Sequence, residues 1–413
     1  MCTSTRVKSA TIMATVLLLL FALSPSYVPT TRAGISLVAT ITKGMGGRPT
    51  GVAYDSAQGE VFVTNGTWNT TSVISDSSNT VVSLIPVGQA PAGVVYDWGT
   101  GELFVTNFLS HTVSVISDST DMAVASISVG LAPFGVAYDS GKGEIFVTNH
   151  ASNTTSVISD SSNTVVANIL VGYGANSVAY DGGKGEVFVT NDVSSTVSVI
   201  SDSTNMVVAT IPIGVGANNV AYDSGKGEVF VINAFSSTVS VISDSTNKVV
   251  ANITVGLGPS GVATDTRLGE VFVANFGSNT TSVISDSTNT VVATIHVGSG
   301  PFGVAYDSGK GEIFVANNAG ESVSVLSASS TTSTTSTTGT TMTSVTAKTS
   351  ITRSASASSS TTNSSMIAST TSAVGVSQDS TPYLAVAAVA IITGGLVGFG
   401  LLRRKKTAQV GQA

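Results

Sequence analysis

Residues 51–55 read Gly-Val-Ala-Tyr-Asp, and close copies of this pentapeptide return every 42 residues along the chain. Each copy ends in an aspartate, and no insertion interrupts the series Asp55, Asp97, Asp139, Asp181, Asp223, Asp265 and Asp307. Each period also holds three further short segments rich in Val, Ile, Phe and Thr and bounded by turn residues, a pattern typical of β-strands. In the third copy we predict strands at 135–139, 144–149, 155–159 and 164–171.

Four short strands in a period of about 42 residues are typical of one blade of a β-propeller. Seven copies therefore predict an all-β, seven-bladed propeller with four-stranded antiparallel blades. Stacked blades bury both faces of their inner strands, which explains apolar runs such as Val61-Phe-Val63. A solenoid is the alternative for any repeat, and it should carry atypical capping repeats at its ends.

The two ends of the array complement each other. After 322–327 the seventh copy has Ala328 where an aspartate is expected, and no fourth strand follows. Before the first copy, Leu37-Val-Ala-Thr-Ile41 repeats the fourth-strand segments at 207–211 and 291–295. We therefore predict that this N-terminal strand completes the last blade, which closes the ring and leaves no open seam.

The second strand of the blades carries a further repeated motif. Phe62-Val-Thr-Asn65 returns at 104–107, 146–149 and 188–191, and it drifts in the later copies. This motif resembles the YVTN repeat of β-propellers known from archaeal surface-layer proteins, with Phe in place of Tyr. The resemblance covers about 37–327. It implies a propeller with an extracellular or surface location, and it says little about activity because propellers host many functions.

The distribution of charge bears on possible partners. The chain carries a net charge of −7, and seven of its 17 basic residues lie before residue 33 or after residue 402. All 24 acidic residues lie between these ends, so the middle of the chain is strongly acidic. Nucleic acid is therefore excluded as a partner, since phosphate contacts need a basic patch. The single cysteine, Cys2, excludes disulfides and Cys-based zinc sites from the mature chain.

Both ends of the chain point to a membrane. Arg6 and Lys8 precede an apolar run at 10–23, which predicts a signal peptide over 1–33, with an uncleaved anchor as the alternative. Residues 382–402 form an uncharged apolar stretch followed by Arg-Arg-Lys-Lys, which predicts a transmembrane helix. We therefore expect a cell-membrane protein with the 34–327 propeller outside the cell and a cytoplasmic tail at 403–413.

Residues 328–381 consist mostly of Ser and Thr, so they cannot bury a core and are expected to form a disordered, mucin-like stalk. Glycosylation on this stalk would hold the propeller away from the membrane. Candidate N-glycosylation sites occur at Asn65, Asn69, Asn153, Asn252, Asn279 and Asn363.

Antiparallel strands sort the loops of a propeller onto two faces. The first-to-second and third-to-fourth turns share one face, here named the turn face, and they repeat nearly unchanged. The second-to-third loops and the links between blades share the other face, here named the variable rim, where the copies differ. Variation with aromatic side chains is typical of a recognition surface. The alternative is that these aromatics plug the channel or pack between blades. The candidate binding residues are Trp68, Phe108, His111, Phe134, His150, Tyr173, Phe235, Phe276 and Phe302.

Chemistry-bearing motifs are few. The three histidines are not spaced as metal ligands, and no glycine-rich loop follows a strand and opens a helix, so no metal and no cofactor is expected. A turn such as Asp139 to Glu144 offers two carboxylates for calcium, but Lys142 lies between them and favours a structural turn. We expect no enzyme. A lactonase-like or lyase-like site at the central mouth, using His111 or His150, is the catalytic alternative.

The sequence thus predicts a cell-surface binding or adhesion module with a glycan or protein ligand, displayed on a glycosylated stalk. A structural component of a surface layer or envelope is the alternative. The repeat leaves the oligomeric state open.

Overall fold

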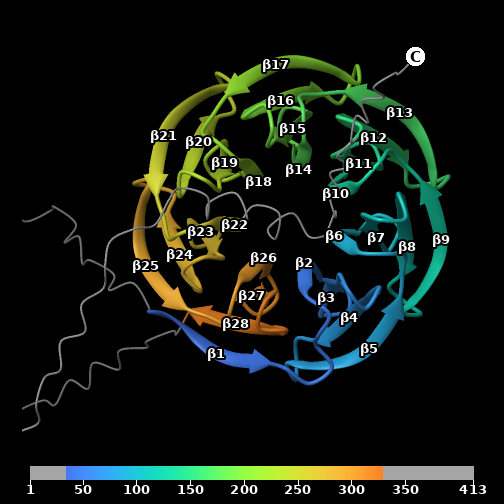
Figure 1. Ribbon diagram of the computed structural model, residues 1–413, viewed down its shortest axis with the longest axis vertical. Coiled ribbons are helices and arrows are strands. Elements are labelled where there is room, and N and C mark those ends of the chain that lie inside the picture. The colour runs from blue at the N-terminus through green and yellow to red at the C-terminus, as the bar shows by residue number, and fades with distance from the viewer. Residues whose placement is uncertain (1–33, 329–413) are drawn as a thin grey trace, which may run out of the picture.

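The computed structural model describes residues 34–328, which form seven four-stranded antiparallel sheets and no helix. Figure 1 shows the sheets arranged as blades around a central axis, with the chain passing from blade to blade in order. The predicted all-β, seven-bladed propeller is therefore confirmed. The predicted signal peptide, most of the stalk, the transmembrane segment, the cytoplasmic tail and Asn363 lie outside the described residues.

Each blade places its first strand nearest the axis and its last strand at the circumference (Figure 1). The innermost strands are β2 (Pro49–Asp55), β6 (Pro91–Asp97), β10 (Pro133–Asp139), β14 (Ala175–Asp181), β18 (Ala217–Asp223), β22 (Pro259–Asp265) and β26 (Pro301–Asp307). The second strands are β3 (Glu60–Asn65), β7 (Glu102–Asn107), β11 (Glu144–Asn149), β15 (Glu186–Asn191), β19 (Glu228–Asn233), β23 (Glu270–Asn275) and β27 (Glu312–Asn317).

The third strands are β4 (Thr70–Ser75), β8 (Thr112–Ser117), β12 (Thr154–Ser159), β16 (Thr196–Ser201), β20 (Thr238–Ser243), β24 (Thr280–Ser285) and β28 (Ser322–Ala328). The outermost strands are β5 (Thr80–Pro86), β9 (Met122–Ser128), β13 (Thr164–Leu170), β17 (Met206–Pro212), β21 (Lys248–Thr254), β25 (Thr290–His296) and β1 (Ile35–Ile41). The strand bounds predicted for the third copy agree with those of β10 to β13 to within two residues. The innermost strands begin earlier than predicted because each pairs through its first residue across a register shift, as Pro133 does with Asn149.

The ring closes through the two ends of the array. β1 pairs with β28 in antiparallel register from Ile35 opposite Ala328 to Ile41 opposite Val323, which makes it the outermost strand of the seventh blade. Figure 1 shows β1, in blue, beside β28, in orange. The predicted closure is confirmed, and the chain between the ends is tied into one continuous ring.

The core lies between the blades. The second strand of each blade carries one phenylalanine whose side chain is almost completely buried. These residues are Phe62, Phe104, Phe146, Phe188, Phe230, Phe272 and Phe314. Phe146 of the third blade belongs to one apolar cluster with Val187 and Val189 of the fourth. Such clusters recur around the ring because both faces of each inner sheet meet a neighbour. Within residues 34–328 no helix is long and apolar enough to cross a bilayer.

Two polar residues of the repeated motif are buried and bonded. The amide nitrogen of Asn65 donates to Thr70 Oγ1 at 3.1 Å and to Ser72 Oγ at 2.8 Å, which ties the end of β3 to the start of β4. Thr64 Oγ1 accepts from the backbone nitrogen of Gly51 at 2.8 Å and donates to the carbonyl of Ala92 in the next blade at 2.7 Å. These groups satisfy buried donors and acceptors that would otherwise lack partners.

Candidate functional site

The links and loops of the variable rim are joined by backbone hydrogen bonds. The nitrogen of Phe108 donates to the carbonyl of Ala90 at 3.0 Å, and His150 repeats this bond with Ala132. The same contact joins Asp192 to Gly174 at 2.9 Å. Second-to-third loops and inter-blade links therefore share one face, as predicted.

The candidate rim residues divide into two groups. Four of them are exposed to solvent. The exposed fractions of Trp68, Tyr173 and Phe235 are 49%, 68% and 52%, and His111 is also exposed. Phe302 is buried at 6% exposure, and four others are half-buried: Phe108, Phe134, His150 and Phe276. Some of the rim aromatics thus face solvent, and others pack inward.

The inward group includes an aromatic cluster near the axis. The ring of Phe134 lies edge-on to Phe108 with centroids 6.3 Å apart, and edge-on to Phe302 with centroids 6.4 Å apart. These residues come from the second, third and seventh blades, so the contact with Phe302 joins blades that do not follow each other in the ring. Edge-to-face packing of this kind is favourable between aromatic rings.

A cavity of about 170 Å³ lies on the axis and is lined by the first half of all seven innermost strands, the half that starts at the variable rim. A ring of valines surrounds it: Val52, Val94, Val136, Val178, Val220, Val262 and Val304. Phe134 and Phe302 line the same cavity, and so do Ser177 and Asn219. The lining contains no charged residue.

Ser177 and Asn219 interrupt a ring of glycines. Five blades have glycine at this position, where a Cβ would meet the backbone of the next blade; at Gly51 it would lie 2.3 Å from the carbonyl oxygen of Ala92. The fourth and fifth blades instead carry Ser177 and Asn219, and Ser177 Oγ donates to Asn219 Oδ1 at 3.2 Å. The two polar side chains therefore form a pair on one side of the cavity.

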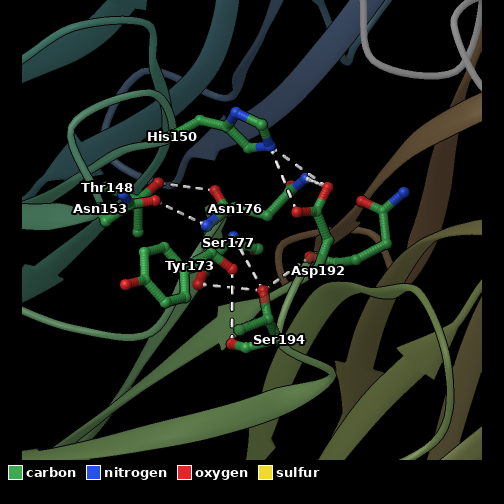
Figure 2. A network of polar contacts seen from close by, with 11 residues as sticks. Thr148, His150, Asn153, Tyr173, Asn176, Ser177, Asp192 and Ser194 are labelled. Atoms are coloured by element: carbon green, nitrogen blue, oxygen red, sulfur yellow. Dashed lines mark hydrogen bonds and ion pairs between the residues drawn. The ribbon is translucent and has the colours of Figure 1, made fainter.

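A histidine–aspartate pair lies beside this polar side of the cavity. His150 Nε2 lies 3.2 Å and 3.3 Å from the two carboxylate oxygens of Asp192, across the boundary between the third and fourth blades (Figure 2). Asn176 Nδ2 donates to Asp192 Oδ2 at 3.4 Å, and the carbonyl of Asn176 accepts from Thr148 Oγ1 at 2.6 Å. Asp192 and Thr148 thus hold Asn176, the neighbour of Ser177, from two sides.

The turn face is held by bonds within and between blades. Asp139 Oδ1 accepts from the backbone nitrogens of Gly141 and Lys142, which closes its own turn. The ammonium of Lys142 lies 3.4 Å from Asp202 Oδ1 in the next blade. These contacts support the structural interpretation of the turns, and among residues 34–328 no group of three or more His, Cys, Asp or Glu side chains could hold a metal ion.

The candidate N-glycosylation sites differ in their surroundings. Asn65 is fully buried, and its amide nitrogen is used in the two bonds to β4. Asn69, Asn252 and Asn279 are exposed, and Asn153 is half-buried. A glycan on Asn65 would require the end of β3 to separate from β4, so we expect this site to stay unmodified.

A larger groove of about 750 Å³ lies at the circumference, between the end of β1 with its linker and β5. The linker at 43–48 is two residues longer than its counterparts, which sets this seam apart from the other blade boundaries. Lys43 is its one charged lining residue, and no aromatic side chain lines it. The axial cavity combines aromatic and polar groups and is therefore the better candidate site.

From the sequence, Phe134, Phe302, His150 and Asp192 are expected at the rim, whereas Ser177 and Asn219 are not expected there. A signal for Ser177 and Asn219 existed, because they are the two departures from glycine at the first residue of the repeat. Trp98 is a further residue that was not singled out from the sequence. It is exposed on the turn face and packs edge-on against Tyr138, with ring centroids 4.9 Å apart.

Comparisons with known proteins support the fold alone. No family model matches the chain, and no curated protein matches it. The structure is similar to that of hydrazine synthase from Kuenenia stuttgartiensis, with a TM-score of 0.61 and 18% sequence identity over 72% of this chain and 98% of that one. At this identity the likeness is one of architecture and carries no activity from one protein to the other.

Proposed function

We propose that the protein is a recognition module that binds its ligand at the variable rim, around the mouth of the axial cavity. One observation carries this proposal. Departures from the repeat gather where all seven blades meet, as Phe134, Ser177, Asn219 and Phe302 around one cavity. Scaffold residues such as the buried Asn65 series stay constant, so the chain varies where a ligand could touch several blades at once.

We also propose that the module belongs to the YVTN propellers and is displayed at the cell surface on a glycosylated stalk, anchored by 382–402. Ser327 pairs with Glu312, and Ala328 pairs with Ile35, so both ends of the described chain lie on the turn face. A stalk that continues from this face directs the variable rim away from the membrane. A glycan or a protein on an opposing surface would then meet the rim first.

We propose that this module binds without catalysing a reaction. His150 bonds Asp192 through Nε2, and among residues 34–328 no serine or threonine hydroxyl is bonded to its ring. A nucleophile activated by histidine needs such a bond. The groups that line the axial cavity are uncharged, which leaves no acid or base inside it.

A structural role in an envelope is the second candidate, and a separate observation favours it. The outermost strand of every blade exposes a valine at the same position, in the series Val38, Val82, Val124, Val166, Val208, Val250 and Val292. Lys248 is the one charged residue in these seven strands. Unpaired, uncharged edge strands favour lateral contact with other copies.

One experiment separates the two candidates. Full-length protein is applied to arrays of glycans and of surface proteins, and the same preparation is imaged on a lipid monolayer by electron microscopy. Recognition predicts saturable binding that is lost when Phe134 is replaced by Asn, the residue at the same position of the fourth blade. An ordered lattice without any binding would refute recognition and support the structural role.

A further inference from the structure

We infer that the axial cavity receives a neutral sugar ring, the terminal residue of a glycan, with Phe134 and Phe302 on one side and Ser177 and Asn219 on the other. This inference rests on the proposed recognition function and names its ligand class. All four side chains line the same cavity of about 170 Å³.

The charge of the site selects a neutral ligand. No lining residue of the cavity is charged, so an ionised group would enter without a counter-charge, at a high desolvation cost. The carboxylate of Asp192 beside the cavity already has a partner, because His150 Nε2 contacts both of its oxygens. An amine would have to displace His150 to reach that carboxylate, so the site favours hydroxyl groups over ammonium or carboxylate groups.

The polar side of the cavity has unused hydrogen-bonding capacity. Asn219 Oδ1 accepts from Ser177 Oγ at 3.2 Å and from the backbone nitrogen of Val220 at 2.9 Å, which fixes the orientation of the amide. The amide nitrogen of Asn219 donates to no partner within residues 34–328, and Ser177 Oγ can still accept. One sugar hydroxyl can accept a hydrogen bond from the amide nitrogen of Asn219, and another can donate one to Ser177 Oγ.

The apolar side of the cavity and its size complete the match. Phe134 is half-buried and lines the cavity, so the C–H face of a sugar ring can pack against it, while Phe302, 6% exposed, lies edge-on to Phe134 in the same lining. A water molecule occupies about 30 Å³ in the liquid, so the cavity has room for about six waters or for one ring of similar size. A longer glycan or a folded protein can place only its tip there.

His150 and Asp192 act as positioning residues in this site. Asp192 holds the Asn176 side chain, and Thr148 holds its backbone carbonyl, so the chain leading into Ser177 is constrained from both sides. Neither His150 nor Asp192 contacts the sugar. Their role is to keep Ser177 facing Asn219.

The test uses variants that the repeat itself supplies. Ser177→Gly and Asn219→Gly introduce the residue that the other five blades carry, so the fold should tolerate them. Full-length protein is screened on an array of neutral, acidic and basic glycans, and the strongest neutral binder is titrated as its free methyl glycoside. We expect Asn219→Gly to weaken binding about tenfold, the loss of one hydrogen bond in a protected site.

Tyr173→Ala and Phe235→Ala are the matched controls, because both residues are exposed rim aromatics that do not line the cavity. They should change affinity less than about twofold, within the range of peripheral contacts. Thermal unfolding of every variant shows whether the fold is intact.

Each other outcome has a distinct meaning. Glycan binding that Tyr173→Ala abolishes and Asn219→Gly leaves unchanged would move the site to the outer rim and overturn the axial assignment, while recognition would stand. Binding of a protein but of no neutral glycan would overturn the sugar class. Absence of any ligand, together with lateral assembly, would overturn recognition itself.

Discussion

The threonine repeated in the first four blades shows what one residue of the motif does for the fold. Thr64 Oγ1 serves a nitrogen in its own blade and a carbonyl in the next, and Thr106, Thr148 and Thr190 do the same. The later blades have Ile232, Ala274 and Ala316 at this position, and in the sixth blade Ser260 Oγ donates instead to Pro301 O at 2.8 Å. A hydroxyl that joins two blades is therefore provided from different positions around the ring.

Replacing Thr64 with Val should lower the free energy of unfolding by about 2 kcal/mol, because the nitrogen of Gly51 and the carbonyl of Ala92 would lose their buried partner. Urea titration of the purified protein measures this change. The control is Thr204→Val at an exposed turn, which should cost less than about 0.5 kcal/mol. Equal costs for the two variants would contradict the proposed bridging role.

Asn65 should carry no glycan when the protein is produced in a host that performs N-glycosylation. Its amide nitrogen is buried and bonded to Thr70 and Ser72, whereas Asn69, Asn252 and Asn279 are exposed. Glycopeptide mass spectrometry reports the occupancy of each site. Substantial occupancy of Asn65 in folded protein would refute the expectation.

At the scale of elements, β1 carries the closure of the ring. It is the one outermost strand that comes from the far end of the chain, and it pairs with β28 along its whole length. Ile41 at its end is 5% exposed and joins the core with Val323 and Val325, whereas Val38 faces solvent. The closure therefore depends on a few inward side chains of β1 as well as on the backbone ladder.

Ile41→Ala should destabilise the propeller by about 3 kcal/mol, the usual cost of a large-to-small change in a packed core. Val38→Ala, on the exposed face of the same strand, should cost less than about 0.5 kcal/mol. Urea unfolding followed by tryptophan fluorescence measures both. Similar midpoints for the two variants would show that β1 closes the ring through its backbone alone.

At the scale of the whole molecule, the turn face gathers carboxylates at the boundaries between blades. Lys142, Lys184 and Lys310 each reach an aspartate of the next blade, with distances of 3.1 to 3.4 Å. The first blade has Gln58 at this position, and the second blade has Asp121 where the others have Asn. Burial raises the pKa of Glu60 to about 7, with the carboxylates of Asp121, Asp55, Asp118 and Asp76 adding to the effect.

This shift makes stability depend on pH in a defined direction. The pKa of Glu60 is higher in the folded state, at about 7, than its ordinary value of 4.5. The contribution of Glu60 to the free energy of unfolding is therefore fully present below pH 4.5 and is lost as the pH rises through 7. Urea midpoints at pH 5 and pH 8 should differ less for Glu60→Gln than for the unaltered protein.

Glu144→Gln is the control for this pH dependence, because burial raises the pKa of Glu144 as well, but the ammonium of Lys142 opposes that rise. It should alter the difference between the two midpoints less than Glu60→Gln does. If Glu60→Gln left the pH dependence of the urea midpoint unchanged, the raised pKa of Glu60 would not be a source of that pH dependence.

The blade number, the strand order and the closure of the ring could all be predicted from the sequence. Each of these follows from local pattern and period: seven aspartates at a constant spacing, four strand segments per period, and complementary ends such as Leu37–Ile41 and the shortened seventh copy. The sequence also separated a constant face from a variable one, because antiparallel strands return their connections to alternate ends.

Which of the variable residues lie together could not be predicted from the sequence and is seen in the three-dimensional structure. Phe134 and Phe302 are far apart in the chain, yet they meet at the axis, while Tyr173 and Phe235, with the same sequence signal, face solvent. Ser177 and Asn219 became a pair because neighbouring blades bring equivalent positions into contact across one cavity. The physical reason is that a repeat specifies contacts within one period, whereas a site on the axis depends on distances between blades that no single period contains.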